Sequence, residues 1–166
     1  MDKTSDMQTK ELRILVAEYE SVEELPEADR ELVLAAREAA QKAYAPYSKF
    51  LVGAALRLEN GVVFRGNNQE NASFTTGLCA ERVTLFYANA AYPEVPVKTL
   101  AITAENSQGL IANPVKPCGS CRQAMVETES RFRQPMRIIL DGKSKVQVFE
   151  GVDNLLPFAF KPDSLD

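Results

Sequence analysis

Three cysteines and one glutamate are the side chains of this sequence best suited to chemistry. Cys79 and Glu81 stand in the stretch CAER, directly before an apolar segment with helical spacing, and Cys118 and Cys121 stand in PCGSC. Both stretches lie where helices are predicted to begin, and the free N–H groups and the dipole at a helix N-terminus stabilise a thiolate. Because a thiolate is the form of cysteine that binds metal, two neighbouring helix starts could present these sulfurs to one ion.

Three cysteine ligands with an open fourth position are typical of a catalytic zinc site, whereas a structural site closes with four ligands. The chain has 3 cysteines and 0 histidines, so a closed site of four Cys or His ligands cannot form within one subunit. We expect water as the fourth ligand, unless a carboxylate or another subunit supplies it. Without histidine, proton transfer falls to a carboxylate, and Glu81 stands closest to a proposed ligand.

Each of these residues also has a simpler interpretation. A C-x-x-C pair at a helix start occurs in redox proteins of the thioredoxin type, and free cysteines are often buried as small apolar side chains. Glutamate in the first turn of a helix is favourable without any catalytic role. Arg82 and Arg122, which follow the two cysteine motifs, could offset the negative charge of a zinc ion with three thiolates or could be ordinary surface arginines.

The composition favours a folded domain and argues against several classes of protein. The chain has 166 residues, of which 45% are hydrophobic, and 23 acidic against 19 basic residues give a net charge of −4. An acidic chain without a lysine and arginine cluster is a poor candidate for binding nucleic acid. No apolar run reaches the roughly 20 residues that span a bilayer, and the N-terminus is unlike a signal peptide, so we expect a cytoplasmic protein with no membrane partner.

The elements that must position the cysteines follow from the hydrophobic pattern, which predicts a flexible tail at 1–10 and a single domain at 11–166. Strands are predicted at 11–19, 51–58, 62–66, 97–105, 136–140 and 145–149, and helices from about 26, 80, 119 and 152. The Asn60-Gly61 pair between two apolar runs indicates a hairpin. The residues expected on one face of the first helix, which Pro46 ends, are Leu32, Leu34, Ala35, Ala39 and Ala43. Alternating helices and strands predict a mixed sheet with helices on both faces.

Several segments of the sequence resemble the zinc-dependent cytidine deaminases, in the small, three-cysteine, homotetrameric branch of the cytidine/deoxycytidylate deaminase family. The segments that carry the resemblance are, in order, AYAPYSKFLVGAAL, NQENAS, CAER, PCGSCRQ and LLPFAF. The resemblance implies a three-layer α/β/α sandwich with a mixed sheet of roughly five strands. The chain departs from the family at Phe74, where relatives often have tyrosine, and in the N-terminal segment 11–19, which lies outside the shared motifs.

The resemblance implies hydrolytic deamination of cytidine and deoxycytidine to uridine and deoxyuridine, with release of ammonia, as in pyrimidine salvage. It implies one zinc ion per subunit, held by Cys79, Cys118 and Cys121. Glu81 would be the proton shuttle, passing a proton to N3 of the pyrimidine and then to the leaving amine. Arg82 would balance charge near the zinc ion.

The resemblance also implies residues that bind a nucleoside substrate in a homotetramer. Asn68 and Glu70 would bind the ribose hydroxyls, for which a carboxylate and an amide are chemically suited. Phe50 would pack against the base, although phenylalanine is more often a core residue. Backbone groups near Ala80 and before Pro117 would bind the edges of the pyrimidine, and Phe160 is the candidate for an aromatic that a neighbouring subunit places in the cavity.

Other functions stay open from the sequence. A deaminase of another aminopyrimidine, such as blasticidin S, would share the zinc motifs, although the NQE stretch favours a nucleoside. A non-catalytic, zinc-stabilised interaction module would have a closed metal site and no need for Glu81. A deaminase acting on nucleotides or nucleic acid is disfavoured, because the chain is acidic and has no obvious phosphate-binding run.

Overall fold

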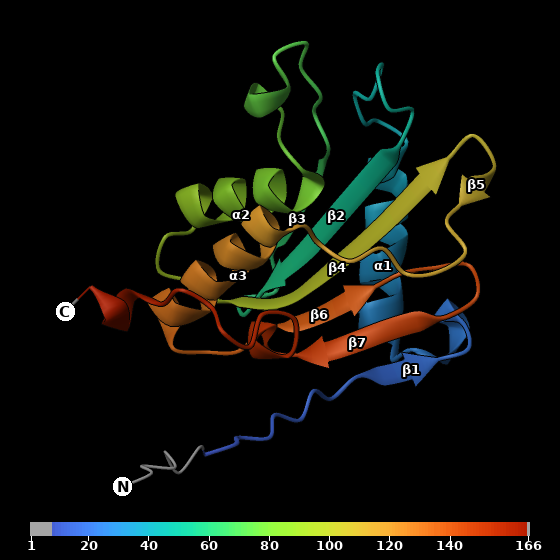
Figure 1. The fold of residues 1–166 in the computed structure, drawn as a ribbon. Helices are drawn as coiled ribbons and strands as arrows, with labels where there is room; N and C mark the ends of the chain where they lie inside the picture. Colours follow the sequence, from blue (N-terminus) through green and yellow to red (C-terminus); the bar gives the residue numbers. More distant parts are fainter. Residues whose placement is uncertain (1–7, 166) are drawn as a thin grey trace, which may run out of the picture.

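The computed structural model describes residues 8–165, which form one mixed β-sheet with helices on both faces (Figure 1). Of the predicted tail at 1–10, the first seven residues lie outside the described range, and residues 8–10 have no regular secondary structure. Within the described range the sheet has seven strands in the order β1-β7-β6-β4-β2-β3, with β5 paired to β4. The strands are β1 (Ala17–Tyr19), β2 (Leu51–Leu58), β3 (Val63–Asn67), β4 (Val97–Asn106), β5 (Gly109–Leu110), β6 (Arg137–Leu140) and β7 (Val146–Glu150).

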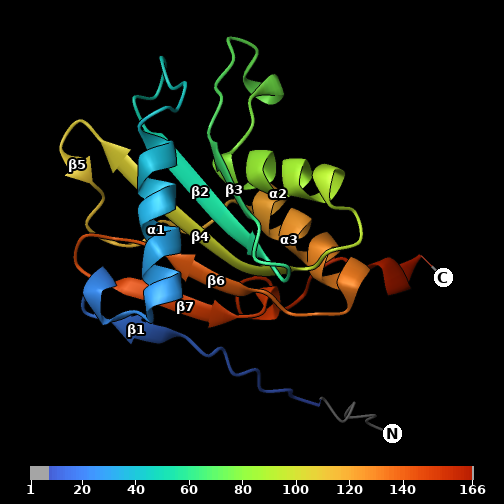
Figure 2. The same ribbon diagram turned by 180° about the vertical axis from the view of Figure 1, so that it is seen from behind.

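Helix α1 (Glu27–Ala40) covers one face of the sheet, and α2 (Ala80–Ala91) and α3 (Gly119–Phe132) lie together on the other, as Figures 1 and 2 show from opposite sides. The alternation of side chains along each strand makes both layers possible, because Ala101 packs toward α1 while Leu100 and Ile102 pack toward α2 and α3. The predicted three-layer α/β/α arrangement is confirmed. The sheet exceeds the roughly five strands expected because β1 and β5 add short pairings at its margins.

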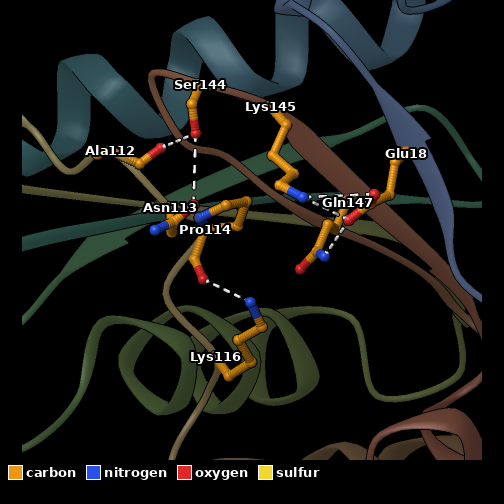
Figure 3. Close-up of polar contacts among 8 residues, drawn as sticks. All are labelled: Glu18, Ala112, Asn113, Pro114, Lys116, Ser144, Lys145 and Gln147. Atoms are coloured by element: carbon orange, nitrogen blue, oxygen red, sulfur yellow. Dashed lines mark hydrogen bonds and ion pairs between the residues drawn. The ribbon is translucent and has the colours of Figure 1, made fainter.

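The predicted N-terminal strand at 11–19 is wrong over most of its length, since β1 contains just its last residues. Ala17 pairs with Val148 of β7, but the N–H of Leu15 donates to Asn154 Oδ1 at 3.1 Å, where the chain leaves β7. Glu18 of β1 accepts hydrogen bonds from Lys145 and Gln147, which holds β1 against β7 (Figure 3). The apolar residues that precede β1 are exposed, and they are Leu12, Ile14, Leu15 and Val16.

Helix α1 buries Leu32, Ala35 and Ala39 as predicted, but Leu34 does not belong to the buried face and Ala43 lies beyond the end of the helix. Leu34, expected inside, is 48% exposed, whereas Val33 and Ala36 are fully buried against the sheet. A Cβ at Gly53 of β2 would lie 2.0 Å from the carbonyl oxygen of Ala36, so glycine is what lets the helix approach this closely. The helix also ends at Ala40, well before the predicted stop.

The hairpin of β2 and β3 agrees with the prediction and supports the second helical layer. Gly61 has φ +85° in the turn, a value that suits glycine, and the two strands pair antiparallel. At Gly66 a Cβ would lie 2.4 Å from the Thr84 hydroxyl, so α2 packs closely on β3. No helix in residues 8–165 is long and apolar enough to cross a membrane.

Candidate metal centre and substrate cavity

The three cysteines meet because two helices begin side by side on the same face of the sheet. Cys79 is the N-cap of α2 and Cys118 is the N-cap of α3, while Cys121 lies in the first turn of α3. The Sγ atoms of Cys79 and Cys118 are 3.9 Å apart, and those of Cys118 and Cys121 are 3.5 Å apart. All three sulfurs lie within 4.8 Å of one another, and they come from two segments widely separated in the sequence.

The cysteine cluster fits a zinc ion. Tetrahedral zinc with bonds of about 2.3 Å to sulfur would separate its ligand sulfurs by about 3.8 Å, close to the distances found here. Among residues 8–165, no carboxylate or further cysteine joins the cluster as a fourth ligand. Three thiolates with room for one more ligand are the donor set of a catalytic zinc site.

The surroundings of the cluster favour a thiolate at Cys79. A hydrogen bond with Cys121, and after it one from the Arg82 guanidinium, lowers the pKa of Cys79 to about 5. The same hydrogen bond, together with burial, raises the pKa of Cys121. Arg82 Nη2 lies 3.9 Å from Cys79 Sγ, and Arg82 Nε is buried without a partner in the described structure. A zinc ion with three thiolates would carry a net negative charge, and such a centre would accept a hydrogen bond from this unpaired donor.

Glu81 is held in the first turn of α2 with its side chain facing the cavity beside the sulfurs. It is just 4% exposed, and burial, reinforced by the charge of Cys79, raises the pKa of its carboxyl group. Burial raises the pKa of a carboxyl group and so favours its protonated form, which suits a group that must both accept and donate a proton in general acid–base catalysis.

A cavity of about 850 Å³ opens in front of Cys79, Cys118 and Glu81. Its volume lies within the range of small-molecule sites, and its wall combines apolar side chains with a few polar groups. The cavity brings together five further residues singled out from the sequence or its family resemblance: Phe50, Asn68, Glu70, Phe74 and Arg82.

Asn68 and Glu70 each have part of their hydrogen-bonding capacity occupied by the protein. Asn68 accepts from the Val52 N–H at 2.8 Å and donates to the Phe50 carbonyl at 2.9 Å, which leaves one amide hydrogen and one lone pair. Glu70 Oε2 accepts from the Tyr47 N–H at 2.9 Å. Hydrogen bonds from the Ser48 hydroxyl and from this loop's backbone lower the pKa of Glu70, so it presents a charged oxygen to the cavity.

Two other lining residues, Tyr47 and Lys116, were not predicted from the sequence. Tyr47 and Phe74 pack edge to face with ring centroids 5.9 Å apart at the wall, and Lys116 lies directly before the PCGSC motif. Lys116 Nζ donates to the Pro114 carbonyl, and the Ser144 hydroxyl donates to the Ala112 carbonyl (Figure 3). These bonds fix the loop that leads to Cys118, but side chain to backbone contacts of this kind leave no periodic pattern in a sequence.

The remaining predicted residues lie outside the cavity wall of their own chain. Ala80 is fully buried behind Cys79, and its carbonyl accepts a hydrogen bond from the Thr84 hydroxyl. Phe160 is 60% exposed near the C-terminus. Arg122 points its guanidinium at backbone carbonyls, donating to Pro117 at 2.8 Å and to Leu155 at 2.7 Å.

Comparison with known proteins gives a consistent result. Residues 26–133 match the family model for the cytidine and deoxycytidylate deaminase zinc-binding region. A cytidine deaminase from Halalkalibacterium halodurans is 45% identical over 102 residues, or 60% of this chain and 71% of that protein. One from Mycobacterium tuberculosis is 36% identical over 133 residues, or 78% of this chain and 87% of that protein. The crystal structure of cytidine deaminase from Burkholderia pseudomallei has a TM-score of 0.68 at 41% identity, covering 78% of this chain and 97% of that one.

Proposed function

This chain belongs to the cytidine and deoxycytidylate deaminase family, as the sequence motifs indicated, and we propose that it converts cytidine and deoxycytidine to uridine and deoxyuridine with release of ammonia. The observation that carries the proposal is the cavity in which Glu81 lies buried beside three clustered cysteine sulfurs. The closed metal site expected of a non-catalytic zinc module lacks support, because no fourth side-chain ligand joins the cluster within residues 8–165.

We assign Cys79, Cys118 and Cys121 as the ligands of one zinc ion per subunit. When bound, zinc supplies Lewis-acid chemistry, lowering the pKa of a coordinated water so that a nucleophile is available near neutral pH. Arg82 lies against Cys79 and offsets part of the negative charge of the thiolates. The backbone N–H groups at the start of each helix also stabilise the negative charge of the thiolates.

Glu81 moves the protons of the reaction. Its carboxylate accepts a proton from the attacking water and delivers it to N3 of the pyrimidine, which makes C4 electrophilic. The water oxygen then forms a bond to C4. Glu81 then transfers the proton of the new C4 hydroxyl to the exocyclic amine, and as the C4 carbonyl forms, the C–N bond breaks and ammonia leaves. Cytidine and water thus give uridine and ammonia, and burial of Glu81 keeps this relay away from bulk solvent.

The polar cavity residues bind the sugar. Glu70 has an oxygen free to accept from the ribose hydroxyls, and Asn68 has a donor and an acceptor left after its contacts with β2. Phe50 lies on the same wall and packs against the base. Backbone groups at Ala80 and before Pro117 bind the edge of the pyrimidine.

The protein acts on a small nucleoside and forms a homotetramer in this proposal. Exposed aromatic side chains support association of subunits, and they include Phe74, Phe86, Tyr87, Phe158 and Phe160. Phe160 would enter the cavity of a neighbouring subunit, and it does not line the described cavity of its own chain. A cytoplasmic location stays a prediction from the sequence.

The proposed activity is tested by incubating zinc-loaded protein with cytidine or deoxycytidine. Conversion to the uracil nucleoside changes the ultraviolet spectrum, and ammonia is measured separately in the same samples. Turnover of both nucleosides supports the proposal. If the protein deaminates blasticidin S but neither cytidine nor deoxycytidine, its substrate is another aminopyrimidine and not the nucleoside. Inactivity toward all three compounds would contradict the proposed function.

A further inference from the structure

Two consecutive side chains near the start of α3, those of Arg122 and Gln123, bind the C-terminal segment 155–160. Arg122 donates to the carbonyl of Leu155 at 2.7 Å, and Gln123 donates through Nε2 to the carbonyl of Phe160 at 2.7 Å. These residues directly follow Cys121, the last of the proposed zinc ligands. Arg122 also holds the Pro117 carbonyl, at the residue before Cys118, so one helix start contacts both the metal centre and the C-terminal segment.

The two ends of this segment are held while its aromatic side chains face outward. Leu155 is buried, and Leu156 and Ala159 pack against the core beneath α2 and α3. Phe158 and Phe160 are 83% and 60% exposed. A backbone fixed at both ends with its phenylalanines exposed keeps those rings in a defined place before any contact with a partner, which lowers the entropy lost on binding.

We propose that Gln123 is a positioning residue for catalysis in a neighbouring subunit. By holding the Phe160 carbonyl, Gln123 fixes where the Phe160 ring stands, and that ring completes the nucleoside cavity of a second copy of the chain. The inference rests on the proposed function, which places Phe160 in that cavity, and adds the residue that sets its position. Gln123 itself is not among the residues lining the described cavity of its own chain.

The direct test replaces the donor with an acceptor. Gln123→Glu keeps the size of the side chain but opposes a carboxylate to the Phe160 carbonyl, which frees the ring. The KM for cytidine should rise about two- to tenfold, the range expected for loss of one hydrogen bond. The kcat and the zinc content should stay near wild type, because the metal ligands and Glu81 are unchanged. Gln123→Lys, which keeps an N–H donor, should restore most of the affinity.

Two controls accompany these variants. Gln108→Glu makes the same chemical change at an exposed position outside the cavity, and its kinetics should match wild type. Phe160→Ala removes the ring itself and should raise KM at least as much as Gln123→Glu. Melting temperatures measured on all variants separate a change in position from a loss of folding.

A mixed assembly decides whether Gln123 acts on a neighbour. Gln123→Glu subunits are co-assembled with a large excess of Glu81→Gln subunits, which cannot turn over substrate but carry an intact Gln123 and Phe160. Most active sites then border a subunit whose Phe160 is correctly held, and their KM should return to the wild-type value. A role of Gln123 limited to the folding or metal site of its own chain would leave KM raised.

The outcomes separate this inference from the function on which it rests. If zinc-loaded wild-type protein fails to deaminate cytidine, both are wrong. If Phe160→Ala raises KM but Gln123→Glu does not, the positioning role is wrong while the proposed function stands. If Gln123→Glu raises KM and mixed assembly does not restore it, Gln123 does not act across subunits and the inference is overturned.

Discussion

The Sγ atoms of Cys79 and Cys118 lie 3.9 Å apart although 39 positions separate the residues in the chain. Each cysteine caps the start of one helix, and the two helices pack side by side on the same face of the sheet. Any ion bound there joins α2 to α3. Metal binding and stability should therefore be linked, because the ion binds the folded arrangement in preference to the unfolded chain.

Cys118→Ala should lose the bound zinc and lower the melting temperature. Removing zinc from the wild-type protein with a chelator should lower its melting temperature as well, whereas the variant should not respond. Zinc content by atomic absorption and thermal unfolding with and without chelator measure both effects. Ser120→Ala, an exposed change in the same turn, is the matched control and should retain zinc. A Cys118→Ala protein with a full complement of zinc would refute the proposed ligand set.

Glu70→Gln should raise the KM for cytidine about tenfold or more, since hydrogen bonds to a charged group contribute about 1.5–3 kcal/mol. The zinc content should not change. A substrate without the 2′ and 3′ hydroxyls of the ribose separates sugar binding from loop structure, because Glu70 also holds the Tyr47 N–H. On 2′,3′-dideoxycytidine the wild type and the variant should have similar KM values. An equal loss on both substrates would show that Glu70 acts through the loop alone.

The metal centre could be predicted from the sequence because each of its two motifs is a short continuous stretch. CAER and PCGSC each place a cysteine where a helix begins, and the structure begins α2 and α3 at Ala80 and Gly119. The contact between Glu70 and the loop at Tyr47 could not be predicted from the sequence, since it joins residues 23 positions apart through a side chain and a backbone N–H. Spacing and hydrophobic pattern carry no trace of such a bond.

The two errors of the secondary-structure prediction have different causes. At about 100° per residue, Leu34 lies about 200° around α1 from the buried Leu32, so helical spacing itself places Leu34 on the exposed face and its assignment to the buried face was wrong. The segment at 11–19 is rich in strand-forming residues, but pairing with β7 stops near Leu15, whose N–H bonds to Asn154 instead. For this segment a partner remote in sequence decides where the strand begins.

Arg37→Met should destabilise the fold by about 2–4 kcal/mol, allowing for the partial exposure of Arg37. Arg37 donates from Nε and Nη2 to both carboxylate oxygens of Asp141, at 2.7 and 2.8 Å, and Thr103 donates to the same group at 2.8 Å. Asp141 is 1% exposed, so loss of the arginine leaves a buried, poorly compensated charge. Chemical denaturation gives the change in unfolding free energy.

The matched control is Arg65→Met, which breaks a largely exposed ion pair with Glu38 and should cost less than about 1 kcal/mol. Combining Arg37→Met with Asp141→Asn should recover part of the stability, because the buried charge is then removed. Equal effects of Arg37→Met and Arg65→Met would show that the Arg37 pair has no special structural role.

Glu129 should contribute to stability through hydrogen bonds and not through its charge. Its Oε1 accepts from the N–H groups of Met136 and Val152, each at 2.9 Å, which joins α3 to two distant segments. Glu129→Gln keeps this acceptor and should be close to neutral, whereas Glu129→Leu leaves two N–H groups unpaired and should cost about 2–5 kcal/mol. Equal stability of the two variants in denaturant would contradict this account.

The same residue gives a pH dependence of known sign. Burial raises the pKa of Glu129 above its ordinary value of 4.5, so the folded chain binds this proton more tightly than the unfolded chain. Its contribution to the unfolding free energy should therefore fall as the pH rises from about 4.5 through the raised native pKa. When unfolding is measured across this pH range, the E129Q protein should lack this decrease in stability. Identical pH profiles for the wild type and E129Q would show that Glu129 does not cause the decrease.

The most direct test of the account compares wild type with Glu81→Gln in parallel assays of zinc content and cytidine turnover. The central claim is that three cysteines hold the metal while Glu81 moves the protons. Both proteins should bind one zinc ion per chain, and kcat should fall by more than about 10²–10⁴-fold in the variant, because Glu81 acts at more than one step. A Glu81→Gln protein that retains zinc and deaminates cytidine at the wild-type rate would contradict the claim.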